Sequence, residues 1–458
     1  MGLKKAVFDF VKGHPGLRLG LRRLLRVLRA GVYRLRTPGV RPDPHTVLFC
    51  SYHGKSASCS PRAVYERMRS DPAYRDYRFF WAVSQPERFA DLAADPRTEV
   101  ISFGGAAFER AMAGAGYWIF NITLPEHISP RRGQTYLQCW HGTPLKRLGY
   151  DIQEGGNAMN SLPEIHRKYR LEGEKVDYFL SPSPFASKCF RSAWQLGRWG
   201  KSDAILEVGY PRNDRLVNAA EEERTALRRK LGIPHGKRAI LYTPTFRDDQ
   251  HISGQGYAYR PAVDFDELRQ KLGKDHVILF RAHYLVASAF DFSAYPGFVL
   301  DVSGVEEIND LYIASDLMIT DYSSTMFDYG VLRRPILFYM YDLEQYRDRL
   351  REEQYFRTWI TRIMVNECRM LCRKNMRMIV AETLPDQAAP EDHDLEMRLM
   401  LESLPEKQRV PLVLHYLEGF SLEEISQVLH VSVGIVKYRM HQARKKLRVE
   451  WNGKEEAL

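Results

Sequence analysis

The 458-residue chain lacks the sequence features of several common classes of protein. No uncharged apolar run approaches the roughly 20 residues that a membrane-spanning helix needs. No Walker sequence is present, so a P-loop nucleotide site is not expected. The six cysteines form no paired framework, and Cys368 and Cys372 have no second ligand pair beside them, so neither a disulfide scaffold nor a zinc site is indicated. We expect an intracellular protein of more than one domain, with its thiols reduced.

Charge is unevenly placed along the chain. The net charge is +10, and residues 1–41 carry eleven Lys and Arg against Asp9 alone, so this arm accounts for the whole excess. Apolar residues recur in the arm at helical spacing with arginines between them. The apolar positions are Leu17, Leu21, Leu24, Leu25, Leu28, Val32 and Leu35. The pattern predicts a basic amphipathic helix.

Such a helix is suited to lie on an anionic membrane surface. Arginines interrupt any apolar region long enough for a signal peptide, so a cleaved leader is not expected. The alternative is a helix that docks on its own domain. Of the two, we predict that residues 1–41 lie on the membrane surface.

From about residue 45 to 346, short apolar runs alternate with helical stretches, which is typical of an α/β protein with parallel sheets. The predicted strands are 46–50, 77–83, 99–102, 117–121, 135–140 and 178–181, with a second series at 204–208, 239–243, 276–281, 298–301, 317–320 and 336–339. We predict two Rossmann-like domains, 42–214 and 215–347. Ligands of such sheets bind beyond the carboxyl ends of the strands.

One loop of the first series carries groups suited to chemistry. The stretch 138–149 (QCWHGTPLKRLG) follows the apolar run 135–137 and contains His141, Gly142, Thr143 and Lys146. Imidazole can take a proton at neutral pH, glycine allows a ligand to approach the backbone, and lysine can hold phosphate. The alternative is a turn with a hydrogen-bonded histidine and a solvated basic pair.

Strand exits of the second series are polar in a consistent way. They contain Thr243, Thr245, Arg247, Arg281, His283, Asp321, Ser323, Ser324 and Thr325. The last three hydroxyls stand at a predicted helix start, which can hold phosphate without a P-loop. Helix capping alone is the alternative. Carboxylates do not cluster at ligand spacing, so we expect neither an obligatory metal nor a cofactor.

The C-terminal part changes character. An acidic linker over 381–397 leads to helical segments over 398–450, in which a serine-capped helix at 420–429 is followed, after a short turn, by a basic helix. The basic residues of the second helix include Lys437, Arg439, Arg444, Lys445 and Lys446. The arrangement predicts a helix-turn-helix whose second helix reads a DNA groove. A solvated basic helix is the alternative.

Six segments in order make the larger part resemble the CDP-glycerol glycerophosphotransferase family of teichoic-acid primases and polymerases. They are 51–56 (SYHGKS), 139–146 (CWHGTPLK), 209–214 (GYPRND), 242–247 (YTPTFR), 281–284 (RAHY) and 310–329. The resemblance, over about 45–347, implies a GT-B-like pair of Rossmann domains. It also implies a cytoplasmic enzyme, peripheral on the inner face of the membrane, that transfers glycerol phosphate from CDP-glycerol to a polyol or lipid-linked acceptor.

Roles follow from this resemblance together with the residue types. The catalytic residues would be His141, as the general base for the acceptor hydroxyl, and His283, which would hold and protonate the donor pyrophosphate. The substrate-binding set would be Gly142, Thr143, Lys146, Arg212, Thr243, Thr245, Arg247, Arg281, Asp321, Ser323, Ser324 and Thr325. Phosphoryl transfer mainly requires such positioning and charge neutralisation.

The C-terminal part resembles an extracytoplasmic-function sigma factor. Residues 348–380 are similar to the last helix of region 2, and 398–450 to region 4, which implies promoter DNA and RNA polymerase as partners. The first part of region 2 is absent, and Ile435 and Tyr438 stand where that family's recognition helix usually has small or hydroxylated residues. The two resemblances meet near residues 345–352.

Two alternative functions belong to other classes. One is a sigma-like DNA-binding regulator with an inactive transferase part. The other is a GT-B glycosyltransferase that uses a nucleotide sugar.

Overall fold

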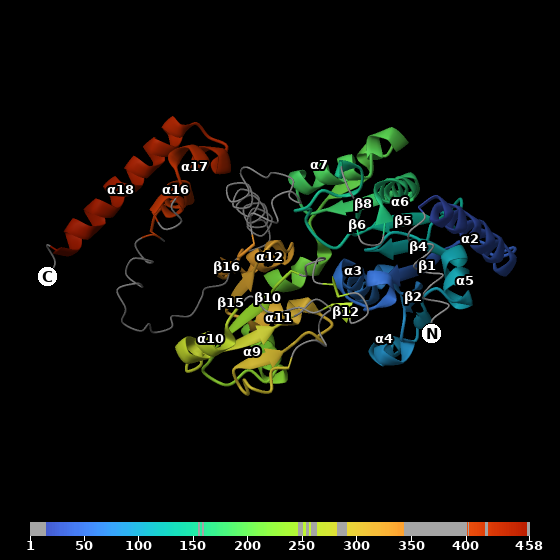
Figure 1. Ribbon diagram of the computed structural model, residues 1–458, viewed down its shortest axis with the longest axis horizontal. Helices are drawn as coiled ribbons and strands as arrows, with labels where there is room; N and C mark the ends of the chain where they lie inside the picture. The colour runs from blue at the N-terminus through green and yellow to red at the C-terminus, as the bar shows by residue number, and fades with distance from the viewer. Residues whose placement is uncertain are drawn as a thin grey trace. The chain divides into compact units, whose positions relative to one another are not determined.

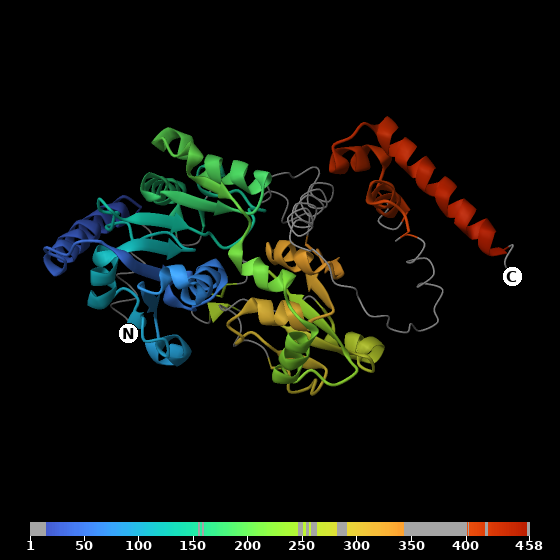
Figure 2. The same cartoon turned by 180° about the vertical axis from the view of Figure 1, so that it is seen from behind.

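The structure is a computed structural model and describes residues 15–153, 156–157, 160–245, 251–252, 256–257, 263–281, 291–342, 401, 403–416 and 420–455. The chain forms two compact units, Met1–Arg349 and Leu350–Leu458, which are considered separately (Figures 1 and 2).

The first unit begins its α/β part with a seven-stranded parallel sheet in the order β3-β2-β1-β4-β5-β8-β9. Its strands are β1 (Asp43–Cys50), β2 (Arg78–Val83), β3 (Thr98–Ser102), β4 (Ala115–Phe120), β5 (Thr135–Gln138), β8 (Tyr178–Ser181) and β9 (Ile205–Glu207). Successive residues of β1 enter different cores: Leu48 and Cys50 join one cluster, and Val47 and Phe49 the other. Both faces of the sheet are therefore covered, as parallel sheets require.

Helices and short hairpins complete this lobe (Figure 1). They are α3 (Cys59–Ser70), α4 (Ala90–Ala93), α5 (Ala106–Gly114), α6 (Leu162–Lys175) and α7 (Pro184–Ala193), with the hairpin β6 (Gly156–Asn157) and β7 (Asn160–Ser161). The strand order reverses between β1 and β4. This switch point is where open α/β sheets bind ligands.

A five-stranded parallel sheet forms the second lobe, in the order β14-β13-β10-β15-β16. Its strands are β10 (Arg238–Thr243), β13 (His276–Phe280), β14 (Val299–Asp301), β15 (Leu317–Thr320) and β16 (Ile336–Phe338). The other elements are α8 (Asp214–Val217), α9 (Glu221–Lys230), α10 (Phe265–Leu272), α11 (Ile308–Ala314), α12 (Thr325–Tyr329), and the strand pair β11 (His251–Ile252) and β12 (Gly256–Tyr257). Thr243 pairs with Thr320, so two polar strand ends lie side by side at this sheet's switch point.

The predicted α/β fold is confirmed, and every predicted strand forms with ends shifted by a few residues. One assignment was wrong. The segment 204–208 was grouped with the second series, but β9 pairs in parallel with β8, Phe179 opposite Ile205 and Ser181 opposite Glu207, and so ends the first sheet. A three-residue strand carries too little pattern to show which sheet it joins.

Helix α2 (Pro15–Arg36) covers part of the first lobe and shows a second face to solvent. Tyr33 and Thr37 are buried against the lobe, and Arg22 and Arg36 form ion pairs with Glu164 and Glu109. The exposed apolar residues are Leu21, Leu24, Leu25, Val27, Leu28, Val32 and Leu35. The helix therefore docks on its own domain and still leaves an apolar stripe uncovered. Among the described residues, no helix is long and apolar enough to cross a membrane.

The second unit contains α16 (Glu406–Tyr416), α17 (Leu422–Leu429) and α18 (Val433–Glu455). Ser421 and Glu424 form a reciprocal capping box at the start of α17. His430, in the left-handed region at φ 53°, ends α17 and turns the chain into α18. Ile425 and Val428 of α17 pack with Val436 and Met440 of α18 in one core. The predicted helix-turn-helix is present. The predicted region 2 helix (348–380) and linker (381–397) lie outside the described residues.

Candidate functional site

A buried network of hydrogen bonds at the end of β5 supports the loop that carries His141. Gln138, the last residue of β5, accepts a hydrogen bond from the Trp140 N–H at 2.8 Å and donates to the Glu172 carboxyl at 3.0 Å. Glu172 also accepts from the Leu124 N–H at 2.9 Å and from the Tyr136 hydroxyl. Trp140 takes a left-handed φ of 46°, an uncommon conformation for a bulky residue. The network stabilises this turn and so directs the next residue, His141.

Asn121 fixes the orientation of the His141 ring. It follows β4, is fully buried, and its carbonyl oxygen lies 2.9 Å from His141 Nδ1. A carbonyl can only accept, so Nδ1 carries the hydrogen and Nε2 carries the lone pair. The Asn121 side-chain oxygen also accepts from the Tyr52 N–H at 2.9 Å. One residue at the switch point thus holds two loops.

His141 is neutral at physiological pH. The side chain is accessible to solvent. Desolvation by the surrounding protein nevertheless lowers the His141 pKa to about 4, although the hydrogen bond to the Asn121 carbonyl acts to raise this pKa. Arg212 and His53 add a smaller lowering of the same pKa. Exposure and desolvation are compatible for a ring that is open at one edge and flanked by protein elsewhere. His141 is therefore a base that is both accessible from solvent and uncharged.

The loop after β1 lies beside this histidine. Tyr52, His53 and Gly54 take left-handed φ values of 49°, 56° and 78° in succession. A Cβ at Gly54 would stand 2.7 Å from the Phe103 Cβ, so only glycine fits. The Tyr52 ring centre lies 5.9 Å from that of His141. Burial, and then the charge of Lys168, lower the pKa of His53. Such strained residues often mark ligand sites.

The His141 loop meets the second lobe at Ser324. A Cβ on Gly142 would stand 3.2 Å from the Ser324 Cβ and closer still to its hydroxyl oxygen, so the two chains approach as closely as glycine allows. Ser324 is the residue before α12 and makes no capping bond with its side chain, whereas the Ser323 hydroxyl accepts from that of Thr325 at 2.9 Å. The predicted base and the predicted phosphate-binding hydroxyls are therefore brought together.

Asp321 organises the neighbouring strand ends. It is buried and accepts hydrogen bonds from the Thr245 N–H and hydroxyl and, at 2.7 Å, from the Tyr322 N–H. Thr243 is buried, and its hydroxyl has no hydrogen-bond partner among the residues that the structure describes. These contacts give Asp321 a structural task. The Thr243 hydroxyl remains available to a ligand or water.

Two of the three predicted arginines have protein partners. Arg212 is buried, and its guanidinium lies 3.0 Å from both oxygens of Asp328. Arg281 donates to the Val305 carbonyl at 2.6 Å. Arg281 therefore holds two loops of the second lobe together, whereas Arg212 also lies 3.5 Å from the Cys59 Sγ and joins the first lobe to α12 of the second. Thr143 is buried and Lys146 is half-buried in the His141 loop, while Arg247 and His283 lie outside the described residues.

In the second unit, the basic side chains lie along α18. Lys437, Lys445 and Arg444 are exposed, Arg439 is half-buried, and Lys446 donates to the Ser403 carbonyl at 2.8 Å. Ile435 and Tyr438 are 43% and 64% exposed on the same helix, so neither is needed for the core. They add apolar surface to the face that would meet DNA.

A family model decides the identity of the larger part. The model of the CDP-glycerol:poly(glycerophosphate) glycerophosphotransferases matches residues 34–358. The chain belongs to this family. A second model, sigma-70 region 4, matches residues 394–447. The transferase match extends past the predicted junction at 345–352, and the resemblance of 348–380 to sigma region 2 remains a prediction.

Relatives of this glycerophosphotransferase-family chain agree with the match. It is 39% identical over 310 residues to the teichoic acid poly(glycerol phosphate) polymerase of Staphylococcus epidermidis, covering 67% of this chain and 42% of that protein. It is 37% identical to the teichoic acid glycerol-phosphate transferase of Staphylococcus aureus, covering 68% of this chain and 77% of that protein. The chain thus spans about two fifths of the polymerase's length.

A solved structure of the wall teichoic acid polymerase TagF, a histidine variant soaked with CDPG, matches with a TM-score of 0.66 and 31% identity over 95% of this chain and 98% of that one. The parallel-sheet, GT-B-like fold of this glycerophosphotransferase-family chain is thereby confirmed.

The sequence did not single out Asn121, Gln138 or Glu172. Asn121 could have been noticed as a polar residue at the end of a buried strand. Gln138 and Glu172 are joined only in the fold, because 34 residues separate them. Within the described ranges, no group of His, Cys, Asp or Glu is arranged to hold a metal ion.

Proposed function

We propose that the transferase part moves glycerol phosphate from CDP-glycerol to a hydroxyl of a polyol-phosphate or lipid-linked acceptor and releases CMP. The observation that carries this proposal is the reachable, neutral His141. Its Nδ1 hydrogen is fixed by Asn121, and its loop contacts Ser324 of the second lobe.

The chemistry would run as an in-line displacement. The acceptor oxygen attacks the phosphorus that bears glycerol while His141 Nε2 takes the hydroxyl proton, and the bond from this phosphorus to the CMP oxygen breaks. The Ser323, Ser324 and Thr325 hydroxyls would hold phosphate oxygens. Arg247 would help to neutralise charge on the leaving CMP, and His283 would hold and protonate the donor pyrophosphate. Positioning and charge stabilisation are what this reaction asks of a protein.

A donor panel tests the proposal directly. Purified full-length protein is given CDP-glycerol, CDP-ribitol or a UDP-sugar with a glycerophosphate-primed acceptor, and CMP or UDP release is measured. We expect CMP release from CDP-glycerol above the other donors, because the two relatives described above carry glycerol-phosphate names. Turnover of the UDP-sugar alone would favour a glycosyltransferase, and no turnover of any donor would favour an inactive transferase part.

We further propose that α2 attaches the protein to the inner face of the cell membrane. The stripe of exposed leucines faces away from the lobe, and arginines flank it. An anionic surface would cover the apolar area and attract the arginines.

Replacing Leu28 and Leu35 together by glutamine tests this attachment. Full burial of a leucine contributes roughly 1.5–3 kcal/mol, so we expect binding to phosphatidylglycerol vesicles to weaken about tenfold or more in a co-sedimentation assay. Leu337→Gln is the matched control, because Leu337 is 56% exposed on β16. Equal binding by wild type and the double variant would contradict the proposal.

For the second unit, we propose DNA binding by α18, with promoter DNA and RNA polymerase as the predicted partners. Replacing Lys437 and Arg439 by alanine should weaken duplex binding and reduce the slope of log affinity against log salt by roughly two, since each phosphate contact contributes about one unit. Lys407→Ala on α16 is the control, because that lysine is exposed on another helix. If the slope of log affinity against log salt were the same in the double variant and in wild type, α18 would not be part of the DNA interface.

A further inference from the structure

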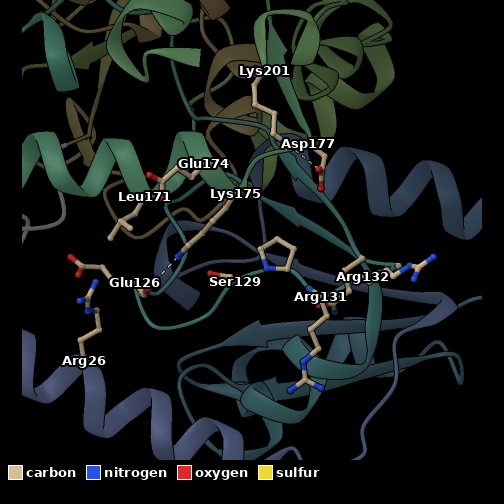
Figure 3. A pocket seen from close by; sticks show the side chains of 13 residues that line it. Arg26, Glu126, Ser129, Arg131, Arg132, Leu171, Glu174, Lys175, Asp177 and Lys201 are labelled. Carbon is tan, nitrogen blue, oxygen red and sulfur yellow. Dashed lines mark hydrogen bonds and ion pairs between the residues drawn. The ribbon is translucent and has the colours of Figure 1, made fainter. Parts of the chain in front are cut away.

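Helix α6 lies along the loop that follows β4, and the contacts between the two fix their register. Lys175, in the last turn of α6, donates to the Pro125 and Glu126 carbonyls at 3.1 and 3.3 Å (Figure 3). Glu172, nearly one turn earlier, accepts from the Leu124 N–H at 2.9 Å. The helix and the loop therefore run in opposite directions, and earlier residues of α6 face earlier residues of the loop.

Lys168 is the next residue on this face of α6. It stands one helical turn before Glu172, which is about 6 Å further along the axis. Long side chains on a helix point back toward its N-terminus, which carries the ammonium further in the same direction. Beyond Leu124 in that direction is Asn121, whose carbonyl oxygen lies 2.9 Å from His141 Nδ1. The register thus directs Lys168 toward the end of the loop that positions His141.

Two further observations place Lys168 beside the site. The ring of the next residue, Tyr169, lies 6.4 Å from that of Trp140, the residue before His141. Burial has the largest effect on the pKa of His53 and of His141, and the positive charge of Lys168 lowers both pKa values further. Charges shift a pKa in this way over short distances. Lys168 is therefore close to both imidazoles.

The Lys168 ammonium has no partner of its own. Among the residues that the structure describes, it forms no ion pair and no hydrogen bond. The two acids that attract it are engaged elsewhere: Glu126 pairs with Arg167 at 3.2 Å, and Glu172 accepts the three hydrogen bonds described above. Residue 168 is exposed, whereas the surrounding protein desolvates its ammonium and lowers its pKa. A bound anion would offset this desolvation.

The proposed acceptor carries a negative charge close to its reactive group. In a glycerophosphate chain, one glycerol unit separates the terminal hydroxyl from the nearest phosphate, so a hydroxyl at His141 Nε2 brings a phosphate with it. We infer that Lys168 binds this phosphate and thereby selects phosphate-bearing acceptors over neutral polyols. An ammonium suits this task, because it holds phosphate as a compact point charge. The inference rests on the proposed function, since it concerns the acceptor of that reaction.

Binding of a minimal acceptor in the absence of donor tests the inference. The probe is diglycerol phosphate, in which a phosphodiester joins two glycerols, and ether-linked diglycerol offers similar hydroxyls without the phosphate. In calorimetry on the full chain at fixed ionic strength, we expect saturable binding of diglycerol phosphate. Lys168→Met should weaken it about tenfold or more, because a charge-assisted contact is lost. Lys168→Arg, which keeps the charge, should restore most of the affinity.

Lys188→Met is the matched control. Lys188 is exposed on α7 of the same lobe, so this variant removes the same charge from another helix. Equal weakening in the two methionine variants would reflect net charge alone and would overturn the inference. The inference would also be wrong if wild type bound diglycerol as tightly as diglycerol phosphate, or bound neither of them saturably.

Turnover supplies a separate measurement. With CDP-glycerol as donor, Lys168→Met should raise the KM for diglycerol phosphate about tenfold or more, while kcat and the KM for the donor stay close to wild type. A fall in kcat with an unchanged acceptor KM would contradict a binding role for Lys168. If wild type releases no CMP, the proposed transferase function fails, whereas the calorimetry still decides whether Lys168 binds the phosphate.

Discussion

Replacing His141 by alanine is expected to reduce CMP release from CDP-glycerol by about 10²–10⁴-fold, the range that a positioned general base contributes. The loss should appear in kcat, because the imidazole acts on the proton that moves in the transition state. The measurement is CMP formation under saturating donor. His235→Ala is the control, since His235 is exposed in the second lobe. Residual activity close to that of wild type, with folding intact, would remove His141 from the chemistry.

The same histidine gives a pH test with a defined sign. The neutral ring is the active form, and desolvation lowers its pKa to about 4. Activity controlled by His141 should therefore be retained as the pH falls through the ordinary histidine range near 6.5 and be lost only as it approaches 4. A profile of kcat/KM against pH with its acidic limb near 6.5 would show that this ring is not shielded in the free enzyme.

Asp328→Ala should lower the free energy of unfolding by about 3–5 kcal/mol, because it leaves the Arg212 guanidinium buried without its counter-charge. The side chains of the pair are only 5% and 10% exposed, and Asp328 also accepts from the Asn213 side chain at 2.9 Å. Asp328 lies in α12, four residues after Ser324, so activity should fall together with stability. Chemical denaturation of the full chain measures the effect on the first unit.

Glu306→Ala is the matched control for this effect. Glu306 forms an ion pair with Arg88 of the first lobe at 2.6 Å, but the two side chains are 36% and 51% exposed. Exposed pairs of this kind contribute only about 0–1 kcal/mol. Similar losses in both variants would mean that burial does not decide the strength of the Arg212–Asp328 pair.

The sequence predicted the parts of the site that local pattern determines. His141 with Gly142, and Ser323 to Thr325, each follow a strand, and the carboxyl ends of parallel strands are ligand sites in any such fold. The contact between Gly142 and Ser324 could not be derived, because it depends on how two lobes pack.

The arginines illustrate a different limit. A guanidinium in a polar turn is compatible with phosphate binding or with a buried carboxylate, and the sequence spacing of 116 residues between Arg212 and Asp328 gives no sign of the second. The role of Asn121 was hidden for the same reason, since its two partners come from separate loops. Strand β9 was misplaced because three residues cannot specify a neighbour.

The left-handed run at Tyr52, His53 and Gly54 has an evolutionary consequence. Non-glycine residues in this conformation carry roughly 1 kcal/mol or more of strain each. A glycine at position 52 or 53 would relieve that strain, yet it would let the loop beside His141 drift. At this turn, a substitution that raises the stability of the fold would therefore lower the catalytic rate. Selection for thermal stability alone would be expected to reduce activity through these two positions.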